Sequence, residues 1–185
     1  MNIAPGIRII AGHRKGRKLA AKYDTTTRPT TDRVRENVFN VLFGLVEIRG
    51  AKVLDLFAGC GAYGLECYSR GAAEVVFNDS DRKAVEVVKK NCKAVGCEAQ
   101  VLNLDFKAAL EKLKSKKFDI IFLDPPYESD FAINSVEIIT KQNMLAENGV
   151  IVIESEKDLE IVPLKLKIYG RARVYFVNPN LQLHK

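Results

Sequence analysis

The chain has 185 residues, of which 47% are hydrophobic, and a formal net charge of +6 at pH 7. This length fits one globular domain with at most a small appendage. No apolar run approaches the roughly 20 residues of a membrane span, and the first residues lack the apolar core of a signal peptide. We therefore expect neither a membrane protein nor a secreted one.

The first 35 residues hold the excess positive charge. They contain nine basic and two acidic residues, a net charge of +7, so residues 36–185 carry −1. A solvated basic surface is one explanation, but such a concentrated excess favours contact with a nucleic-acid backbone. The candidate nucleic-acid contacts are Arg8, Arg14, Lys15, Arg17, Arg28, Thr30 and Arg33.

The same front segment predicts a hairpin and then a helix. Residues 7–10 and 17–19 flank a basic, glycine-containing turn, which is typical of a short β-hairpin. Pro29 and the threonines around it exclude a helix over residues 25–31, and apolar residues at helical spacing predict one from Asp32 onward. We expect residues 1–31 to form a basic hairpin extension and residues 32–185 to form one compact domain.

From residue 51 the pattern alternates between strand and helix. The expected strands are a first strand ending at Phe57, then 74–78, 101–104, 118–123 and 150–154, and an antiparallel pair at 165–169 and 173–177. The expected helices cover about 62–70, 81–95, 106–114 and 130–142. This order predicts a Rossmann-like α/β fold, with a mostly parallel seven-stranded sheet covered by helices on both faces.

The turn after the first strand is the expected ligand site. Gly59, Gly61 and Gly64 match the spacing of the dinucleotide fingerprint, which favours a dehydrogenase. Asp55 opposes that interpretation because its carboxylate would repel a pyrophosphate. It could instead pair with the cationic amino-acid tail of S-adenosylmethionine, which has no phosphate.

Acidic residues also follow the next two strands. Asp79 lies 24 positions after Asp55, about where an acid reaches ribose hydroxyls, and Asp105 could accept a hydrogen bond from an adenine amino group. Either acid could instead lie in a loop or cap a helix. Asp81 and Asp105 are the plausible caps, because each stands directly before a predicted helix. The candidate residues for binding S-adenosylmethionine, the methyl donor, are Asp55, Phe57, Ala58, Gly59, Gly61, Asp79, Ser80, Asp105 and Phe106.

The stretch Asp124-Pro125-Pro126-Tyr127 follows the fourth strand and contains the candidate catalytic residues. It could be an ordinary proline-stiffened turn. Prolines, however, hold neighbouring groups in place, here the Asp124 carboxylate and the Pro125 carbonyl beside the Tyr127 ring. Two fixed acceptors on the N–H groups of an exocyclic amine would draw it toward tetrahedral geometry while the tyrosine stacks on the base.

These residues carry a resemblance to a known family. Residues 124–127 resemble motif IV of S-adenosylmethionine-dependent amino-methyltransferases, and residues 55–61 resemble their motif I. From about residue 7 to 154, and more loosely to 177, the chain resembles the bacterial 16S ribosomal RNA guanine-N2 methyltransferases of the small subunit. The blocks that make this resemblance specific are Arg8-Ile9-Ile10-Ala11-Gly12, Lys15-Gly16-Arg17, Thr27-Arg28-Pro29-Thr30, Asp32-Arg33-Val34-Arg35-Glu36 and Phe39-Asn40.

The resemblance implies a class I methyltransferase fold, S-adenosylmethionine as cofactor, and 16S rRNA in the small subunit or an assembly intermediate as partner. It also implies that Asp55, Gly59 and Gly61 hold the methionine end of the donor. Separately, we expect a cytoplasmic monomer without a metal site. Cys60 and Tyr63 depart from the serine and leucine expected in the family. We expect them to alter the packing of the loop and to preserve donor binding.

Three other functions stay open on the sequence alone. An adenine-N6 methyltransferase of DNA or RNA shares the Asp-Pro-Pro-Tyr stretch, and only the N-terminal blocks argue against it. A non-catalytic RNA-binding or ribosome-assembly protein would have no need of that stretch, nor would a dehydrogenase. The four cysteines show no C-x-x-C spacing, so we expect reduced thiols.

Overall fold

The computed structural model describes residues 7–21, 32–126 and 129–181. Its helices are α1 (Asp32–Phe43), α2 (Ala62–Ser69), α3 (Arg82–Val95), α4 (Phe106–Leu113), α5 (Phe131–Lys141) and the short 3-10 helix η1 (Pro179–Leu181). Its strands are β1 (Lys52–Asp55), β2 (Glu74–Asn78), β3 (Gln100–Leu102), β4 (Phe118–Leu123), β5 (Leu145–Ser155), β6 (Lys165–Tyr169) and β7 (Ala172–Val177). Within these ranges no helix is both long and apolar enough to cross a bilayer.

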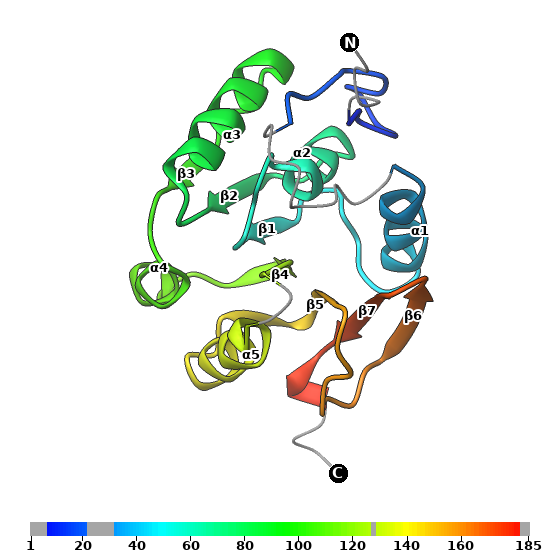
Figure 1. Cartoon of the computed structure of the whole chain (residues 1–185), viewed down its shortest axis with the longest axis vertical. Helices are drawn as coiled ribbons and strands as arrows, with labels where there is room; N and C mark the ends of the chain where they lie inside the picture. Colours follow the sequence, from blue (N-terminus) through cyan, green and yellow to red (C-terminus); the bar gives the residue numbers. More distant parts are fainter. Residues whose placement is uncertain (1–6, 22–31, 127–128, 182–185) are drawn as a thin grey trace.

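The strands form one seven-stranded sheet in the order β3-β2-β1-β4-β5-β7-β6 (Figure 1). The pairs from β3 to β5 are parallel, whereas β7 is antiparallel to β5 and to β6. The predicted mostly parallel sheet and its antiparallel end are therefore confirmed. Strand order reverses between β1 and β4, and the crevice at such a reversal is where open α/β sheets bind ligands.

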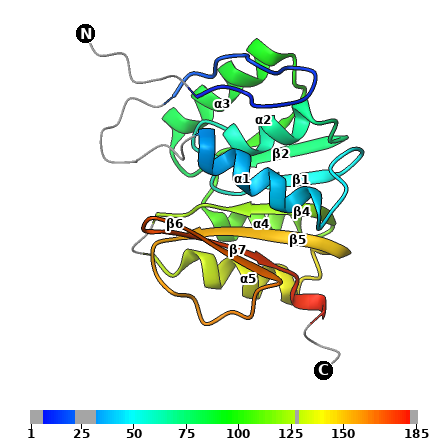
Figure 2. The same ribbon diagram turned by 90° about the vertical axis from the view of Figure 1, so that its right-hand side faces the viewer.

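Helices cover both faces of the sheet (Figures 1 and 2). One core cluster joins the sheet to α1, α2 and α3 through residues such as Phe39, Leu65 and Val88. The other joins it to α4 and α5 through residues such as Leu110 and Ile139. Alternate residues of each strand enter opposite clusters, as the pleat of a strand requires.

β1 and β3 end two residues earlier than predicted, because the side chain of Asn78 replaces part of the ladder. Asn78 is buried at the end of β2. Its Nδ2 donates to the carbonyls of Leu56 at 3.1 Å and Leu104 at 3.0 Å, and its Oδ1 accepts from the Leu104 N–H at 3.2 Å. The amide thus satisfies the backbone groups that three diverging strands leave unpaired.

The helix boundaries agree more closely with prediction than the start of β5 does. The four helices expected after residue 60 match within one residue at each end. β5 begins five residues earlier than expected, because Leu145 pairs with Phe118 before a bulge, and the ladder resumes where Val150 pairs with Ile120. Glu147, Asn148 and Gly149 lie in that bulge.

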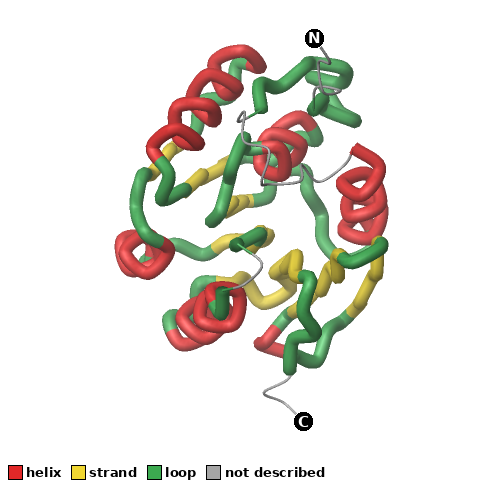
Figure 3. Tube along the Cα trace, viewed as in Figure 1, coloured by secondary structure: helices red, strands yellow, loops and turns green. Residues whose placement is uncertain are grey.

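The predicted N-terminal hairpin is present as a single antiparallel bridge between Arg8 and Lys18. Figure 3 therefore draws its two arms as loop. Ile7, Ile9 and Leu19 are buried in the cluster that contains α1 to α3. The division of the chain at residue 31 stays a prediction.

The hairpin is fastened to the C-terminal half of α2. The carboxylate of Glu66, which is fully buried, accepts from the N–H groups of Ile10 at 2.7 Å and Ala11 at 2.9 Å. The carbonyl of Ser69 accepts from the His13 N–H at 2.8 Å. Because buried backbone donors need partners, these bonds determine where the hairpin lies.

Replacing Glu66 with alanine should lower the free energy of unfolding by about 3–5 kcal/mol, because it leaves two partly buried N–H groups and the Arg70 guanidinium without their acceptor. Urea denaturation measures the change. The control is Glu86→Ala, which breaks an exposed pair with Arg82 and should alter stability by less than about 0.5 kcal/mol. Equal losses in the two variants would contradict the anchoring role.

Candidate active site

The site lies at the carboxyl ends of β1 and β4, where the strand order reverses. After β1 the chain turns through the glycine loop, defined here as residues 56–61, and enters α2 at Ala62. The Ala58 N–H donates to the Asn78 carbonyl at 2.9 Å. Gly61 has a φ of 80°, a left-handed conformation that residues with a side chain rarely adopt. The loop therefore aims the first turn of α2 at the sheet edge.

Gly64, the third glycine of the dinucleotide-like spacing, lets α2 pack closely on β2. A Cβ at this position would lie 2.3 Å from a ring carbon of Phe77 on β2. The Gly64 N–H also donates to Asp55 Oδ2 at 3.1 Å. The resemblance to a dinucleotide fingerprint is thus explained by close contact between helix and strand, together with a carboxylate beneath the start of the helix.

Asp55 is 3% exposed. Burial raises its pKa from 3.8 to about 7, the Gly64 hydrogen bond opposes that rise, and the negative charge of Asp79 adds to it. A carboxylate in such surroundings favours a cationic partner, because a nearby positive charge stabilises its ionised form.

Asp79 and Asp105 also stabilise the local backbone. Asp79 accepts from the Gly59 N–H at 2.8 Å and from the Asp81 N–H at 2.9 Å. Asp105 caps α4 through Oδ1, which accepts from the N–H groups of Lys107 and Ala108. Asp81 caps α3 in the same way. The capping roles considered for Asp81 and Asp105 are confirmed, and Asp79 ties the glycine loop to β2.

Three aromatic rings gather beside these acids. The Phe57 ring stacks on Phe131 with centroids 6.4 Å apart and planes at 10°. Phe106 lies 5.8 Å from Phe57 and 4.8 Å from Phe131. Phe131 is 39% exposed, so the cluster presents an aromatic surface at the edge where α4 and α5 begin.

Asp124 lies beside Glu154, which the sequence analysis did not select. In the parallel ladder Leu123 pairs with Ile153, so the next residue of each strand, Asp124 and Glu154, are neighbours. Pro125, Pro126 and Glu154 line a pocket of about 530 Å³. The rule that selected Asp55, an acid at the carboxyl end of a strand, would have selected Glu154 as well.

The pKa of Asp124 is raised well above its usual value by burial and by the negative charges of Glu154 and Asp55. Tyr63, one of the two departures from the family, is buried and donates its hydroxyl to Glu154 Oε1. Burial and this carboxylate raise the pKa of Tyr63. Cys60, the other departure, contributes its carbonyl, which accepts from Asn91 Nδ2 at 2.8 Å.

The remaining predicted site residues have varied environments. Tyr127, Arg28 and Thr30 lie outside the described residues. The exposed candidate RNA contacts are Arg8, Lys15, Arg17 and Arg33. Arg14 is partly buried against Gly96 at the end of α3. Arg35, counted in the basic segment, is buried and bonds to Asp32 at 2.9 Å.

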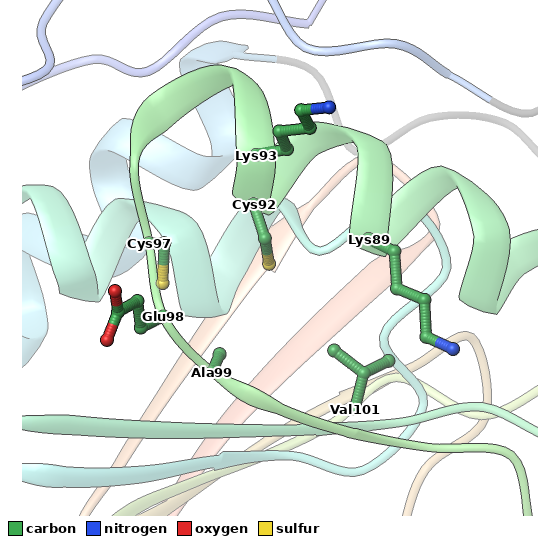
Figure 4. A pocket seen from close by; sticks show the side chains of 7 residues that line it. All are labelled: Lys89, Cys92, Lys93, Cys97, Glu98, Ala99 and Val101. Carbon is green, nitrogen blue, oxygen red and sulfur yellow. The ribbon is translucent and has the colours of Figure 1, made fainter.

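A second pocket of about 530 Å³ lies between α3 and β3 (Figure 4). None of the predicted site residues lines it. It contains two of the four cysteines, Cys92 and Cys97, and all four thiols are free. In the described part of the chain, no group of three or more His, Cys, Asp or Glu side chains could hold a metal ion.

The raised pKa of Asp55 predicts a pH-dependent cost of folding. Between about pH 4 and pH 7 the folded protein keeps the Asp55 proton while the unfolded chain has lost it, so stability falls as pH rises through this window. Asp55→Asn keeps an acceptor for Gly64 and removes the cost. Its stability relative to the original chain should increase by up to about 1.4 kcal/mol per pH unit.

Urea denaturation at several pH values measures this difference. Below about pH 4 both side chains are neutral, so measurements there provide an internal control, and the two proteins should differ least. A difference that stays constant from acid to neutral pH would contradict the burial of an ionisable Asp55.

Comparison with known proteins identifies the family of this chain. The family described as conserved hypothetical protein 95 matches residues 7–177. Ribosomal RNA small subunit methyltransferase D of Haemophilus influenzae is 36% identical, with 84% of this chain and 82% of that protein covered. The protein of the same name from Escherichia coli K12 is also 36% identical, with 88% and 82% covered.

One similar solved structure was determined with ligands bound. The Thermus thermophilus 16S rRNA N2 G1207 methyltransferase, in complex with AdoMet and guanosine, aligns with a TM-score of 0.67 and 27% identity. The alignment covers 83% of this chain and 44% of that one. The observed sheet is that of class I S-adenosylmethionine-dependent methyltransferases, and the chain belongs to the ribosomal RNA small subunit methyltransferase D family.

Proposed function

We propose that this protein transfers the methyl group of S-adenosylmethionine to N2 of a guanine in 16S rRNA, within the small ribosomal subunit or an assembly intermediate. One observation carries the proposal. The structure brings Asp124 and the two prolines after it next to Asp55 at the crevice between β1 and β4, in a chain of an rRNA methyltransferase family.

The acids at the strand ends fit this donor and disfavour a dinucleotide. Asp55 suits the ammonium of the methionine end, and Asp79 suits the ribose hydroxyls. Although Asp79 already accepts two backbone N–H groups, a carboxylate has about four acceptor sites, which leaves capacity for hydroxyls. Asp105 and the Phe57–Phe106–Phe131 rings offer an acceptor and an aromatic surface to adenine. A pyrophosphate would be repelled by these carboxylates.

The donor supplies an electrophilic methyl group, and its transfer forms an N–C bond, breaks the S–C bond and leaves S-adenosylhomocysteine. The lone pair of the guanine N2 is delocalised into the ring and is a poor nucleophile. The Asp124 carboxylate and the Pro125 carbonyl accept its two N–H groups and localise that pair. Asp124 then takes the proton that N2 loses, as a general base.

A guanine reaches Asp124 and Pro125 only after it has left its stack. Extrusion costs a few kcal/mol and is cheapest for an unpaired base, so RNA without regular duplex structure is the preferred substrate. Ribosomal subunits are assembled in the bacterial cytoplasm, where we expect this enzyme to act as a monomer.

The basic hairpin would contact RNA at a distance from that base. Its tip is held by Ser69 at the far end of α2, and the eight residues of this helix separate the tip from the glycine loop by about 12 Å. Exposed Lys15 and Arg17 would therefore contact phosphates several nucleotides away and orient the substrate.

Asp124→Asn should lower the turnover number at least about 100-fold, because the amide can accept a hydrogen bond and cannot take the proton. Binding of S-adenosylhomocysteine, measured by calorimetry, should change little. The control is Asp119→Asn, at the opposite end of β4, where the side chain accepts from the Lys52 N–H. Loss of S-adenosylhomocysteine binding in Asp124→Asn would mean that Asp124 contacts the methyl donor and not the guanine, contrary to the proposal.

Replacing both Lys15 and Arg17 with alanine should weaken RNA binding and lower the slope of log affinity against log salt by about 1.4 to 1.8, from two lost phosphate contacts. The matched control replaces Lys112 and Lys141, which are exposed on α4 and α5, and should leave the slope unchanged. Equal slopes for all three proteins would rule out the hairpin as an RNA contact.

A further inference from the structure

Three carboxyl groups meet at the ends of three adjacent strands, β1, β4 and β5. Asp55, Asp124 and Glu154 each lie two residues after a member of one core cluster, namely Val53, Phe122 and Val152. Since side chains alternate along a strand, the three carboxyl groups share the face covered by α1 to α3. Asp55 and Glu154 are each 3% exposed.

Tyr63 positions Glu154, the acid of this group that belongs to β5. It lies in the first turn of α2, and its ring stacks on Phe122 with centroids 4.6 Å apart and planes at 14°. Its hydroxyl donates to Glu154 Oε1. Packing thus fixes the ring, and the fixed ring directs a donor at Glu154 from the helix above the sheet.

Two arginines near this cluster bond to other acceptors. Arg35 on α1 is close enough to lower the pKa of Tyr63, but its Nη2 donates to Asp32 and to the Arg8 carbonyl. On β7, Arg173 is paired with Asp158 at 2.6 Å. Like charges that share a site cannot all ionise at ordinary cost, so protons must be distributed unequally among these acids.

We propose that Glu154, held by Tyr63, is a positioning residue for methyl transfer: its negative charge beside Asp124 makes Asp124 the group that takes the proton from N2. The inference rests on the proposed function. A hydroxyl donor favours the ionised form of Glu154, so the proton released by the base goes to Asp124. The raised pKa of Asp124, caused by burial, Glu154 and Asp55, agrees with this assignment.

The proton accounting is simple. Once the N–C bond has formed, N2 carries a positive charge and one proton too many. Asp124 accepts that proton and later releases it to solvent, while Glu154 keeps its charge throughout. Tyr63 keeps its own proton, because burial and the neighbouring carboxylate raise its pKa.

The test is the pH dependence of kcat/KM for methyl transfer to unmethylated small subunits, in the full chain and in Glu154→Gln and Tyr63→Phe. Glu154→Gln removes the charge with little change of shape. The acidic limb of the pH profile of this variant should move to lower pH by about one unit, because Asp124 then loses its proton more readily. The plateau value of kcat/KM should fall, because Asp124 is then a weaker base.

Tyr63→Phe keeps the ring stack and should move the limb in the same direction by less, because Glu154 then competes for the proton. The control is Tyr175→Phe, a buried tyrosine of β7 whose hydroxyl accepts from the Leu159 N–H at 3.1 Å; its limb should not move. Binding of S-adenosylhomocysteine reports folding of each variant, and if Glu154→Gln does not fold, Tyr63→Phe decides alone.

An unshifted limb in folded Glu154→Gln or Tyr63→Phe, whether or not the rate falls equally at all pH values, would overturn the inference and leave the proposed function standing. Absence of transfer by the unmodified chain at every pH would overturn the proposed function itself, and the inference with it. The two failures are therefore distinguishable.

Discussion

The close approach of α2 to the sheet at Gly64 is the constraint on which the rest of the structure depends. A single added carbon there would lie 2.3 Å from the Phe77 ring, so α2 would have to move away from β2. Its first turn orients the glycine loop and donates to Asp55. Its second half supplies Glu66 and Ser69, which hold the hairpin. One packing contact therefore places the donor end of the site and the basic hairpin relative to each other.

The same face of the sheet holds two acids whose charged forms cost stability. Asp55 and Asp124 both have raised pKa values because burial disfavours their charged forms. Perturbed groups of this kind gather at functional sites. The buried hydrogen bonds to Glu66 and the aromatic packing of Tyr63 on Phe122 supply rigidity around them, as a site that must hold a base and a donor in register requires.

Local signals predicted most of the fold. Hydrophobic periodicity, glycines and caps are properties of neighbouring residues, and the helices after residue 60 followed them closely. The roles of Glu154 and Glu66 could not be predicted in this way, because their partners Tyr63 and Ile10 lie 91 and 56 positions away in the chain. Arg35 likewise counts as surface charge in the sequence, yet it is buried because Asp32 and the Arg8 carbonyl accept from it.

The central claim concerns the base and the atom that receive the methyl group. The most direct measurement transfers a labelled methyl from S-adenosylmethionine to unmethylated small ribosomal subunits and, separately, to duplex DNA, followed by nucleoside analysis of the products. N2-methylguanosine from the subunits, with no label in DNA, is the predicted result. N6-methyladenine from either substrate, or no label from the subunits despite donor binding, would contradict the account.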